Sequence, residues 1–566
     1  MHDKIRRYLT PGAMTILALF CVLGPVSHAE DAAPSDASAH VLQAEIALHR
    51  MDYLQAAREY RKAAELSESV DIARQATRIG SSFGFNTEAI KAAERWLELD
   101  NESDEALFHL ARLQLRDGNL RAARRSYRTL IERGDGEPDQ RLLSLISVFS
   151  EEDPEASYEV MSALAKPYRD SPDANYAVAV MALQAGEIDD AKKRALKTLE
   201  LEPGEWLTTK AKLLYGRILL LSGDADGAID YVARIIGDNP QPDPSARMEL
   251  ALIMMTAGRD DDALSQVNQV LLENSNQPDA LRLMAIINFR LENLDAAYED
   301  FQDLLASGQH TMDALYYLAR IADYRDEPDR AIRLYSQVEQ GAHAIPAQRR
   351  AAALIAFERD DADAAIKQLD QFARENPLSA IEMVQAKAQL LASVERYPEA
   401  LDYYDRLIEY RPENEGVLLG RGELLLRMGR LDDAVSQYRA AAKRWPNSPT
   451  ALNALGYTLA DRTDRYREAE KLIRKALKYE PESPAIIDSL GWVLYKLGRH
   501  DEALVELTRA YERLDDPEVA AHIIEVLVAL GRADEAIELL VAAESKDPES
   551  PLLKDVKARV LPELDD

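Results

Sequence analysis

Hydrophobic and polar positions in this chain repeat with a period of about 34 residues. Each repeat has a small residue, then an aromatic or aliphatic residue four positions later and an apolar residue seven positions later; a proline often follows twelve positions after the small residue. The small residues are Ala56, Ala89, Ala123, Ala191, Ala228, Ala263, Ala297, Ala331, Ala365, Ala400, Ala434, Ala469, Ala503 and Ala536. The one long interval, between Ala123 and Ala191, holds Ser157 at the missing position. A small residue beside apolar ones is needed where two helices cross closely, so the pattern predicts antiparallel helix pairs stacked into a solenoid.

The repeats fill most of the 566 residues. We therefore predict an all-α solenoid of about fifteen helix-turn-helix repeats, with little room for a separate catalytic domain. This organisation favours a binding surface over an enzyme, and we expect no catalytic residues.

Changes in composition divide the chain into five segments. We expect a signal peptide over 1–29, a flexible leader over 30–38, an N-terminal stack over 39–239 and a C-terminal stack over 240–548, followed by a capping helix and acidic tail over 549–566. Within the first stack, a degenerate repeat is expected near 136–172. The two stacks are separated at GDNPQPDPS (237–245), because three prolines within five residues must interrupt any helix.

The repeats nearest to a known signature lie in the C-terminal part of the chain. They read LNALGYTLADRTDRYREAEKLIRKALKYEPES and IIDSLGWVLYKLGRHDEALVELTRAY. These motifs resemble the tetratricopeptide repeat, and the resemblance extends in phase over 39–548. It implies a right-handed superhelix whose first helices line a concave, protein-binding groove.

A narrower resemblance is carried by NALGYTLADRTDRYREA together with DSLGWVLYKLGRHDEA. This pair is similar to proteobacterial envelope proteins related to the lipoprotein adaptor of a carboxyl-terminal processing protease. The resemblance implies a protein that performs no chemistry and brings a periplasmic protease together with its substrates. Phe20 stands before Cys21, where a lipoprotein signal has a small residue, and this departure puts an outer-membrane anchor in doubt.

The N-terminus has the pattern of an export signal. Three basic residues precede the apolar run AMTILALFCVL (13–23), and Ser27-His28-Ala29 supplies small residues for a signal peptidase. The run is short for a bilayer span. We expect a periplasmic protein, cleaved before Glu30; lipidation at Cys21 and an uncleaved anchor are the alternatives. Contact with a membrane is expected only if Cys21 is lipidated.

Composition and spacing argue against several kinds of chemistry. The formal net charge of −31 repels phosphate backbones, so nucleic acid is not an expected partner. The single cysteine, Cys21, leaves with the signal, and the nine histidines lack the His-x3-His spacing of a helical zinc site. No glycine-rich phosphate loop occurs, and GDADGAID (223–230) has Ala233 where a calcium loop needs a glutamate. We expect no cofactor and no metal.

The remaining candidates lie on the first helices, at positions that face the groove in the related repeats. Counting back from the alanines gives the candidate binding residues Arg282, Phe289, Arg290, Tyr316, Arg320, Tyr324, Arg427, Asn453, Tyr457, Asp461, Asp488, Trp492, Tyr495 and Lys496. Aromatic rings beside arginines are typical of interface hot spots. The alternative is that these rings pack between neighbouring first helices.

The sequence thus predicts a non-catalytic periplasmic scaffold that binds protein partners, most concretely an adaptor between an envelope protease or other envelope enzyme and its substrates. One alternative is a scaffold for surface polysaccharide export or envelope assembly. An enzyme built on helices is a weaker alternative, because no convergent titratable groups are evident.

Export gives a first testable prediction. Because Ser27-His28-Ala29 precedes the expected cleavage point, the native protein should begin at Glu30 and contain no cysteine. Intact-mass measurement of protein isolated from its own cells checks this. A mass that corresponds to a diacylated Cys21 at the N-terminus would contradict soluble export.

Overall fold

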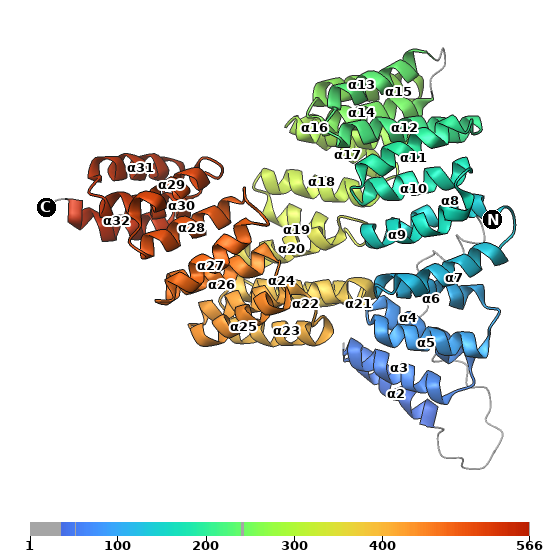
Figure 1. Cartoon of the computed structure of the whole chain (residues 1–566), viewed down its shortest axis with the longest axis horizontal. Coiled ribbons are helices and arrows are strands. Elements are labelled where there is room, and N and C mark those ends of the chain that lie inside the picture. The colour runs from blue at the N-terminus through green and yellow to red at the C-terminus, as the bar shows by residue number, and fades with distance from the viewer. Residues whose placement is uncertain (1–35, 51, 239–242, 565–566) are drawn as a thin grey trace. The chain divides into compact units, whose positions relative to one another are not determined.

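The computed structural model describes residues 36–50, 52–238 and 243–564, and all regular structure within them is helical. The chain divides into two compact units, unit 1 up to Met383 and unit 2 from Val384 (Figure 1). In the described residues, 31 α-helices follow one another as fifteen successive pairs and a final α32. The prediction of an all-α, paired-helix solenoid is confirmed.

The helices of unit 1 are α2 (Asp36–His49), α3 (Tyr53–Leu66), α4 (Val70–Ser82), α5 (Asn86–Leu99), α6 (Asp104–Arg116), α7 (Leu120–Arg133), α8 (Pro138–Phe149), α9 (Pro154–Ala165), α10 (Pro172–Gln184), α11 (Ile188–Glu200), α12 (Glu205–Leu221), α13 (Ala225–Gly237), α14 (Pro244–Thr256), α15 (Asp260–Glu273), α16 (Pro278–Arg290), α17 (Leu294–Ala306), α18 (Thr311–Tyr324), α19 (Pro328–Ser336), α20 (Ala344–Glu358) and α21 (Ala362–Glu375). Short 3₁₀ turns are η1 (Lys166–Tyr168) and η2 (Pro377–Ser379). The division between the units falls inside α22 (Ala380–Ser393).

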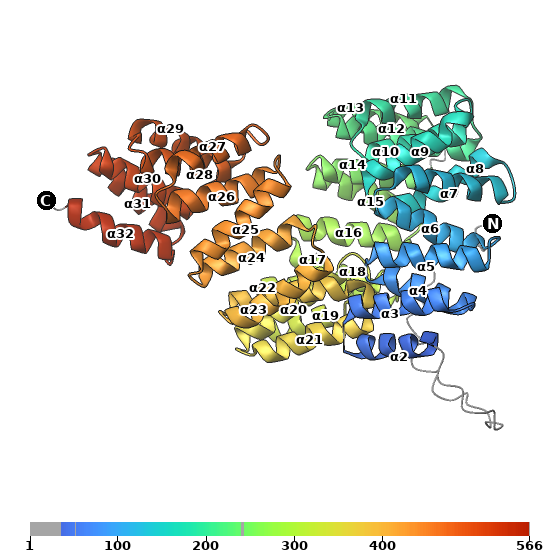
Figure 2. The ribbon, with the colours of Figure 1, turned by 60° about the horizontal axis from the view of Figure 1, so that its bottom comes forward.

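The helices of unit 2 are α23 (Tyr397–Tyr410), α24 (Glu415–Arg427), α25 (Leu431–Arg444), α26 (Pro449–Arg462), α27 (Tyr466–Leu477), α28 (Pro484–Lys496), α29 (His500–Tyr511), α30 (Pro517–Ala529), α31 (Ala533–Lys546) and α32 (Pro551–Leu564). Even-numbered helices are the first helices of their pairs, and they contact one another from pair to pair, as along α24, α26, α28 and α30. Within each unit, consecutive pairs lie side by side (Figure 2).

The periodic small residues lie at the crossing inside each pair. All fourteen alanines and Ser157 are at most 1% exposed. The crossings in unit 2 are tight enough to require glycine on the facing helix: a Cβ added at Gly491 would lie 2.5 Å from Leu507 Cγ, and one at Gly456 would lie 2.6 Å from Ile473 Cγ1. The sequence pattern therefore located the closest helix contacts correctly.

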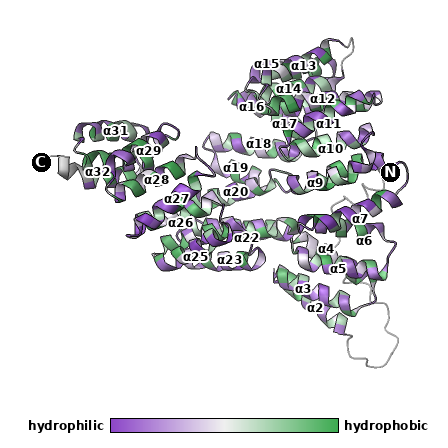
Figure 3. Cartoon of the chain, viewed as in Figure 1, coloured by the Kyte–Doolittle hydropathy of each residue, from purple (hydrophilic) through white to green (hydrophobic). Residues whose placement is uncertain are grey.

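Helix starts follow the polar and proline signals of the sequence. Asp224 caps α13 by accepting a hydrogen bond from Gly227 N at 2.9 Å, and Asp361 caps α21 by accepting one from Ala364 N at 2.8 Å. The acidic run over 260–262 forms the first turn of α15, where carboxylates meet the positive end of the helix dipole. The acidic clusters therefore serve to begin second helices. Hydrophobic and hydrophilic residues are interspersed along the helices (Figure 3), as paired amphipathic helices require.

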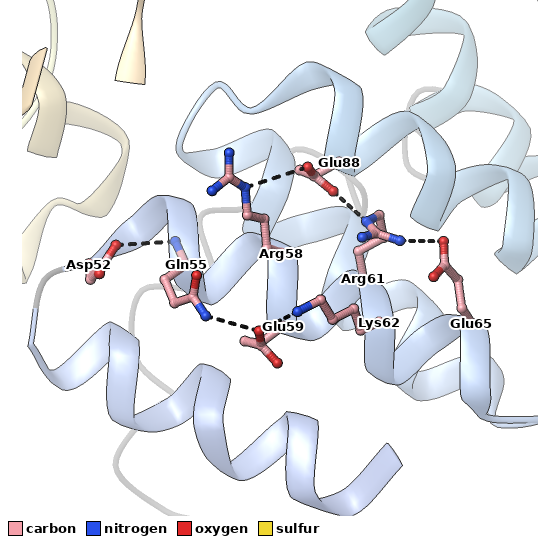
Figure 4. Close-up of polar contacts among 8 residues, drawn as sticks. All are labelled: Asp52, Gln55, Arg58, Glu59, Arg61, Lys62, Glu65 and Glu88. Atoms are coloured by element: carbon pink, nitrogen blue, oxygen red, sulfur yellow. Dashed lines mark hydrogen bonds and ion pairs between the residues drawn. The ribbon is translucent and has the colours of Figure 1, made fainter. Parts of the chain in front are cut away.

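Ion pairs connect successive repeats. In the first two pairs, Arg61 of α3 contacts both Glu65 of its own helix and Glu88 of α5, and Arg58 Nε lies 4.0 Å from Glu88 (Figure 4). On the same helix, Lys62 Nζ lies 2.8 Å from Glu59 (Figure 4). Similar pairs recur about one repeat apart, as in Arg217 with Glu249. These contacts fix the register of one pair on the next.

Two expected boundaries differ from the structure. Residues 36–38, expected in the flexible leader, form the first turn of α2, because Ala37 packs into the hydrophobic interior. The division between compact units falls at 383/384, whereas we expected it at 239/240. The core of α12 to α16 continues from Ile236 to Leu250, so apolar packing bridges the proline-rich connection even though the helices stop there.

The terminal segments are described in part. The segment expected to be a signal peptide, Cys21 and the first part of the expected leader lie outside the described residues, as do the last two acidic residues. Helix α32 packs on α30 and α31, with Leu553 and Val556 buried. Across the described parts of the chain, no helix combines the length and apolar character needed to cross a bilayer.

Packing at the crossings gives a second testable prediction. Ala503 is fully buried and its carbonyl oxygen would lie 3.2 Å from a Cβ at Gly491, so Ala503→Leu should overpack the α28–α29 crossing by about 1–3 kcal/mol. Hydrogen exchange should accelerate in α28 and α29 first, because each repeat contacts only its neighbours. The matched control is Ala485→Leu, at an exposed position of α28. Equal protection in both variants would refute this crossing geometry.

Candidate functional site

All candidate residues except Arg290 and Arg427 fall into two separate groups, one in each unit. The α18 cluster of unit 1 consists of Arg282, Phe289, Tyr316, Arg320, Tyr324 and the neighbouring His343. The α28 cluster of unit 2 consists of Asn453, Tyr457, Asp461, Asp488, Trp492, Tyr495, Lys496 and two neighbours, Glu518 and His522.

The α28 cluster joins three consecutive first helices by polar contacts. Trp492 Nε1 on α28 donates a hydrogen bond to Asp461 Oδ1 on α26 at 3.2 Å. His522 Nδ1 on α30 lies 2.9 Å from Asp488 Oδ1 on α28. Tyr457 on α26 reaches across to α30, where its hydroxyl donates to Glu518 Oε1 at 2.7 Å. The cluster is therefore an internal network that holds α26, α28 and α30 in register.

Burial shows that the centre of this cluster is not an open binding surface. Trp492 is only 4% exposed because its ring stacks on His522 at 4.1 Å between centroids, and Lys496 Nζ lies 4.2 Å above it. Asp488 is likewise buried. We expected both side chains to face a partner across the groove; the alternative, packing between neighbouring first helices, describes them instead. Replacing Trp492 by alanine would first remove core packing.

The rim of the α28 cluster remains partly accessible. Tyr495 and Lys496 are half-buried. The ammonium nitrogen of Lys496 lies 5.7 Å from the centroid of the Tyr495 ring. Asn453 is half-buried, and its Oδ1 atom accepts no hydrogen bond from the described residues. These three residues are the part of the cluster that a partner could still contact.

Burial and neighbouring charges shift two titratable groups in the α28 cluster. Burial opposes a positive charge on His522, but the hydrogen bond and charge of Asp488, together with the charges of Glu518 and Glu525, raise its pKa above the ordinary 6.5. Burial and the charge and hydrogen bond of Glu518 raise the pKa of Tyr457 far above its ordinary 10.0, so the phenol stays protonated. The imidazole is the only one of the two that titrates near neutral pH.

Two predicted arginines take other partners. Arg427 lies exposed on α24, and its Nε donates to Glu423 Oε1 of the same helix at 3.2 Å. Arg290 points back to the preceding pair, where its Nε donates to Asp260 Oδ1 at 3.0 Å. Both guanidinium groups therefore contact carboxylates within the repeats and belong to neither cluster.

The α18 cluster is more open. Arg320 is exposed and its guanidinium lies 4.6 Å above the Phe289 ring and 5.9 Å from the Tyr316 centroid. The Tyr316 ring stacks on His343 with 4.1 Å between centroids and an interplanar angle of 2°. Tyr324, the last residue of α18, is 69% exposed. The structure thus combines the predicted residues of α16 and α18 into an aromatic and cationic surface.

Asp313 of α18 contacts two residues of the α18 cluster. Its carboxylate contacts Arg282 of α16, and its second oxygen lies 3.5 Å from His343 Nε2. Burial and the positive charges of Arg282 and Arg320 lower the pKa of His343, and together they outweigh the carboxylate of Asp313, which alone would raise it. The stacked imidazole is therefore held in its neutral form. A neutral ring stacked on Tyr316 leaves Arg320 as the exposed cation of this surface.

Sequence reasoning missed His522, Glu518 and His343. His522 lies 34 residues after Asp488, at the same register position one repeat later, so the period could have identified it. Glu518 precedes it by one helical turn and could have been found in the same way. His343 follows α19, which ends after nine residues, and this irregular spacing removes the periodic signal. In the described residues, no group of three potential ligands is placed to hold a metal ion.

The raised pKa of His522 gives a third testable prediction. A folded-state pKa above the unfolded value means that the charged His522–Asp488 pair stabilises unit 2 fully below about pH 6.5, and the contribution is lost as pH rises through the folded-state value. The hydrogen-exchange protection of α28 and α30 should therefore fall between about pH 6 and pH 8, after correction for intrinsic exchange rates. His522→Gln should abolish this dependence and the control His500→Gln should retain it. A pH dependence that survives in His522→Gln would contradict the assignment.

Comparisons with known proteins agree with this architecture. Models of the tetratricopeptide repeat match residues 82–138, 179–242, 219–287, 385–449, 419–463 and 453–519. Together the matched residues make up more than half of the chain. They include most of the α28 cluster, whereas the α18 cluster lies outside them apart from Arg282.

Individual relatives match over part of their length. The TPR repeat-containing protein PA4667 of Pseudomonas aeruginosa is 32% identical over 215 residues, which are 38% of this chain and 36% of that protein. The mitochondrial import receptor subunit TOM70 of Saccharomyces cerevisiae is 23% identical over 331 residues, 56% of this chain and 52% of that protein. The chain thus spans about a third to a half of the relatives it matches.

Solved structures with similar helical arrays include the APC/C hetero-tetramer Cut9–Hcn1 (15% identity, TM-score 0.33) and yeast Tom70 (13% identity, TM-score 0.37). Each alignment covers 93% of this chain and 96% of the other. The periodic crossings, the paired helices and the matched repeat models lead to one conclusion: the chain belongs to the tetratricopeptide repeat family, whose helix pairs form scaffolds for protein–protein interaction.

Proposed function

We propose that this protein is a non-catalytic periplasmic scaffold, an adaptor that brings an envelope protease or another envelope enzyme together with its protein substrates. The observation that carries the binding role is the α18 cluster. There the exposed Arg320 lies over the rings of Phe289 and Tyr316, and the exposed Tyr324 ends the same first helix, α18. Arginine and tyrosine are the residue types enriched at the energetic centres of protein interfaces.

The geometry of the α18 cluster favours a protein ligand. Its rings are already ordered by stacking on His343 and by the guanidinium of Arg320, so little conformational entropy is lost on contact. The guanidinium group of Arg320 can bind a carboxylate or a backbone carbonyl of a partner. The ring of Tyr324 provides apolar contact area, and its hydroxyl can form a hydrogen bond. A partner segment that crosses α16 and α18 would meet both.

The adaptor role and the location rest on the sequence. The N-terminal 29 residues have the pattern of an export signal, and the repeats around α26 and α28 resemble those of a protease adaptor. TOM70, a relative by sequence, is by its name a receptor subunit for import. A partner enzyme held at one cluster and its substrate held at another would be brought together without chemistry by the scaffold itself.

A fourth testable prediction addresses the binding surface. Tyr324→Ala and Arg320→Ala should each weaken binding of the native partner by about 2 kcal/mol, close to thirtyfold, because both side chains are exposed and of the types that dominate interface hot spots. The partner is first identified by affinity purification of the full chain from its own cell envelope with mass spectrometry. Affinity is then measured by titration of the purified partner, and circular dichroism verifies folding.

The matched control is Tyr479→Ala, which removes an exposed tyrosine of unit 2 outside both clusters and should change affinity less than about twofold. Recovery of a protease that binds normally to both α18 variants would refute the α18 cluster as its site. Recovery of glycan synthases alone would refute the adaptor role and favour the polysaccharide scaffold.

A further inference from the structure

A second candidate surface lies on α7, a second helix of unit 1. Four arginines of this helix follow the spacing i, i+3, i+4, i+7 and so share one helical face. This α7 strip consists of Arg121, Arg124, Arg125 and Arg128. All four side chains are exposed. The strip is a local concentration of positive charge in a chain of net charge −31.

Unlike most arginines of the described residues, the four of the α7 strip have no carboxylate partner. The neighbouring Arg112 contacts Glu151 and Glu152, and Arg350 pairs with Asp323 at 2.6 Å. Within the described residues, by contrast, none of the four strip arginines has a carboxylate oxygen within 4.0 Å. The four unpaired guanidinium groups repel one another. An anionic ligand bound between them would reduce this repulsion.

The degenerate repeat explains why these arginines are unpaired. Arg61 of α3 contacts Glu88 of α5, but at the corresponding positions α7 has Arg128 and α9 has Ala156, so this ion pair cannot form between α7 and α9. Instead a pocket of about 900 Å³ opens between them, lined by Arg124 and Arg128 of α7 and by Glu155 and Glu159 of α9. The loss of the regular repeat therefore leaves both free cations and an open space beside them.

We propose that the α7 strip and this pocket bind an acidic peptide segment of a protein partner, one with several carboxylates and an apolar side chain. The guanidinium fork matches a carboxylate in two parallel hydrogen bonds. The pocket also presents Tyr158, Ala163 and Pro167, which offer an apolar contact for one side chain. The Tyr158 ring is held in place because its hydroxyl donates to Asp190 Oδ2 of α11 at 3.0 Å.

The mixed charge of the pocket selects a peptide over other polyanions. Glu155, Glu159 and Glu187 line the same pocket as the cations Arg124, Arg128 and Lys166. A phosphate backbone or an anionic bilayer carries continuous negative charge and would be repelled by these glutamates. The strip is about 10 Å long at 1.5 Å per residue, the length of two turns of an acidic helix. A short peptide can place its carboxylates on α7 and its apolar residue in the pocket.

This site lies on a second helix and goes beyond the binding role proposed for the first helices. Its test uses the full chain and a fluorescent peptide of about a dozen residues, with glutamates in the i, i+3, i+4, i+7 spacing and one leucine beside them. Fluorescence anisotropy measures the affinity. Arg124→Glu combined with Arg128→Glu should weaken binding at least about tenfold, because two attractive contacts become repulsive.

The matched control is Lys192→Glu combined with Lys193→Glu, which makes the same charge change at exposed positions of α11 and should weaken binding less than about threefold. Tyr324→Ala should leave peptide binding unchanged, so the α7 site and the α18 cluster can fail separately. Equal loss in both charge-reversal variants, or no binding of the peptide to the wild-type chain, would overturn the proposal. Tighter binding of a DNA oligonucleotide or of phosphatidylglycerol vesicles than of the peptide would also overturn it.

Discussion

The close crossing of two helices at a small residue is the contact on which the rest of this protein depends. At each crossing a buried alanine, or serine in one repeat, lets a second helix lie directly against the first. Larger side chains four and seven positions later then fill the space on either side, as Leu507 does beside Gly491. Because each pair buries its apolar face only against its neighbours, the same small residue has to recur for the stack to continue.

Ion pairs about one repeat apart depend on that crossing geometry. They hold one pair in register with the next, and surface pairs of this kind contribute little stability singly. Where the repeat is degenerate, around α8 and α9, the hydrophobic crossing survives: Ser157 is buried and donates to Phe149 O at 3.0 Å. The ion pair between successive second helices is missing there, because α9 has no counterpart of Glu88. The arginines of the α7 strip therefore face solvent. A degenerate repeat can thus retain its hydrophobic core while the neighbouring helix exposes charged side chains to solvent.

Similar residue types are buried in the α28 cluster and exposed in the α18 cluster. In unit 2, α30 supplies His522 and Glu518, which cover Trp492 and bind Tyr457, and the candidates become core. In unit 1, the short α19 and the irregular segment before α20 place Tyr335 and His343 against the Tyr316 ring but leave Arg320 uncovered. Arg320 and Tyr324 therefore remain exposed. The neighbouring helix, more than the residue itself, decides whether an aromatic side chain is core or surface.

The helix pairs, their number and the buried alanines could all be predicted from the amino-acid sequence, because these follow from a period that each repeat encodes locally. The acidic helix starts could be predicted as well, since they depend on residues only a few positions apart. Arg427 pairs with Glu423 on its own helix, a local contact that the groove analogy overlooked. The burial of Trp492 and Asp488, the pairing of Arg290 with Asp260 and, among the described residues, the lack of carboxylate partners for the α7 strip became evident from the tertiary structure alone. Those three outcomes depend on side chains about one or two repeats away, and the size and angle of the neighbouring helix are not encoded in the local pattern.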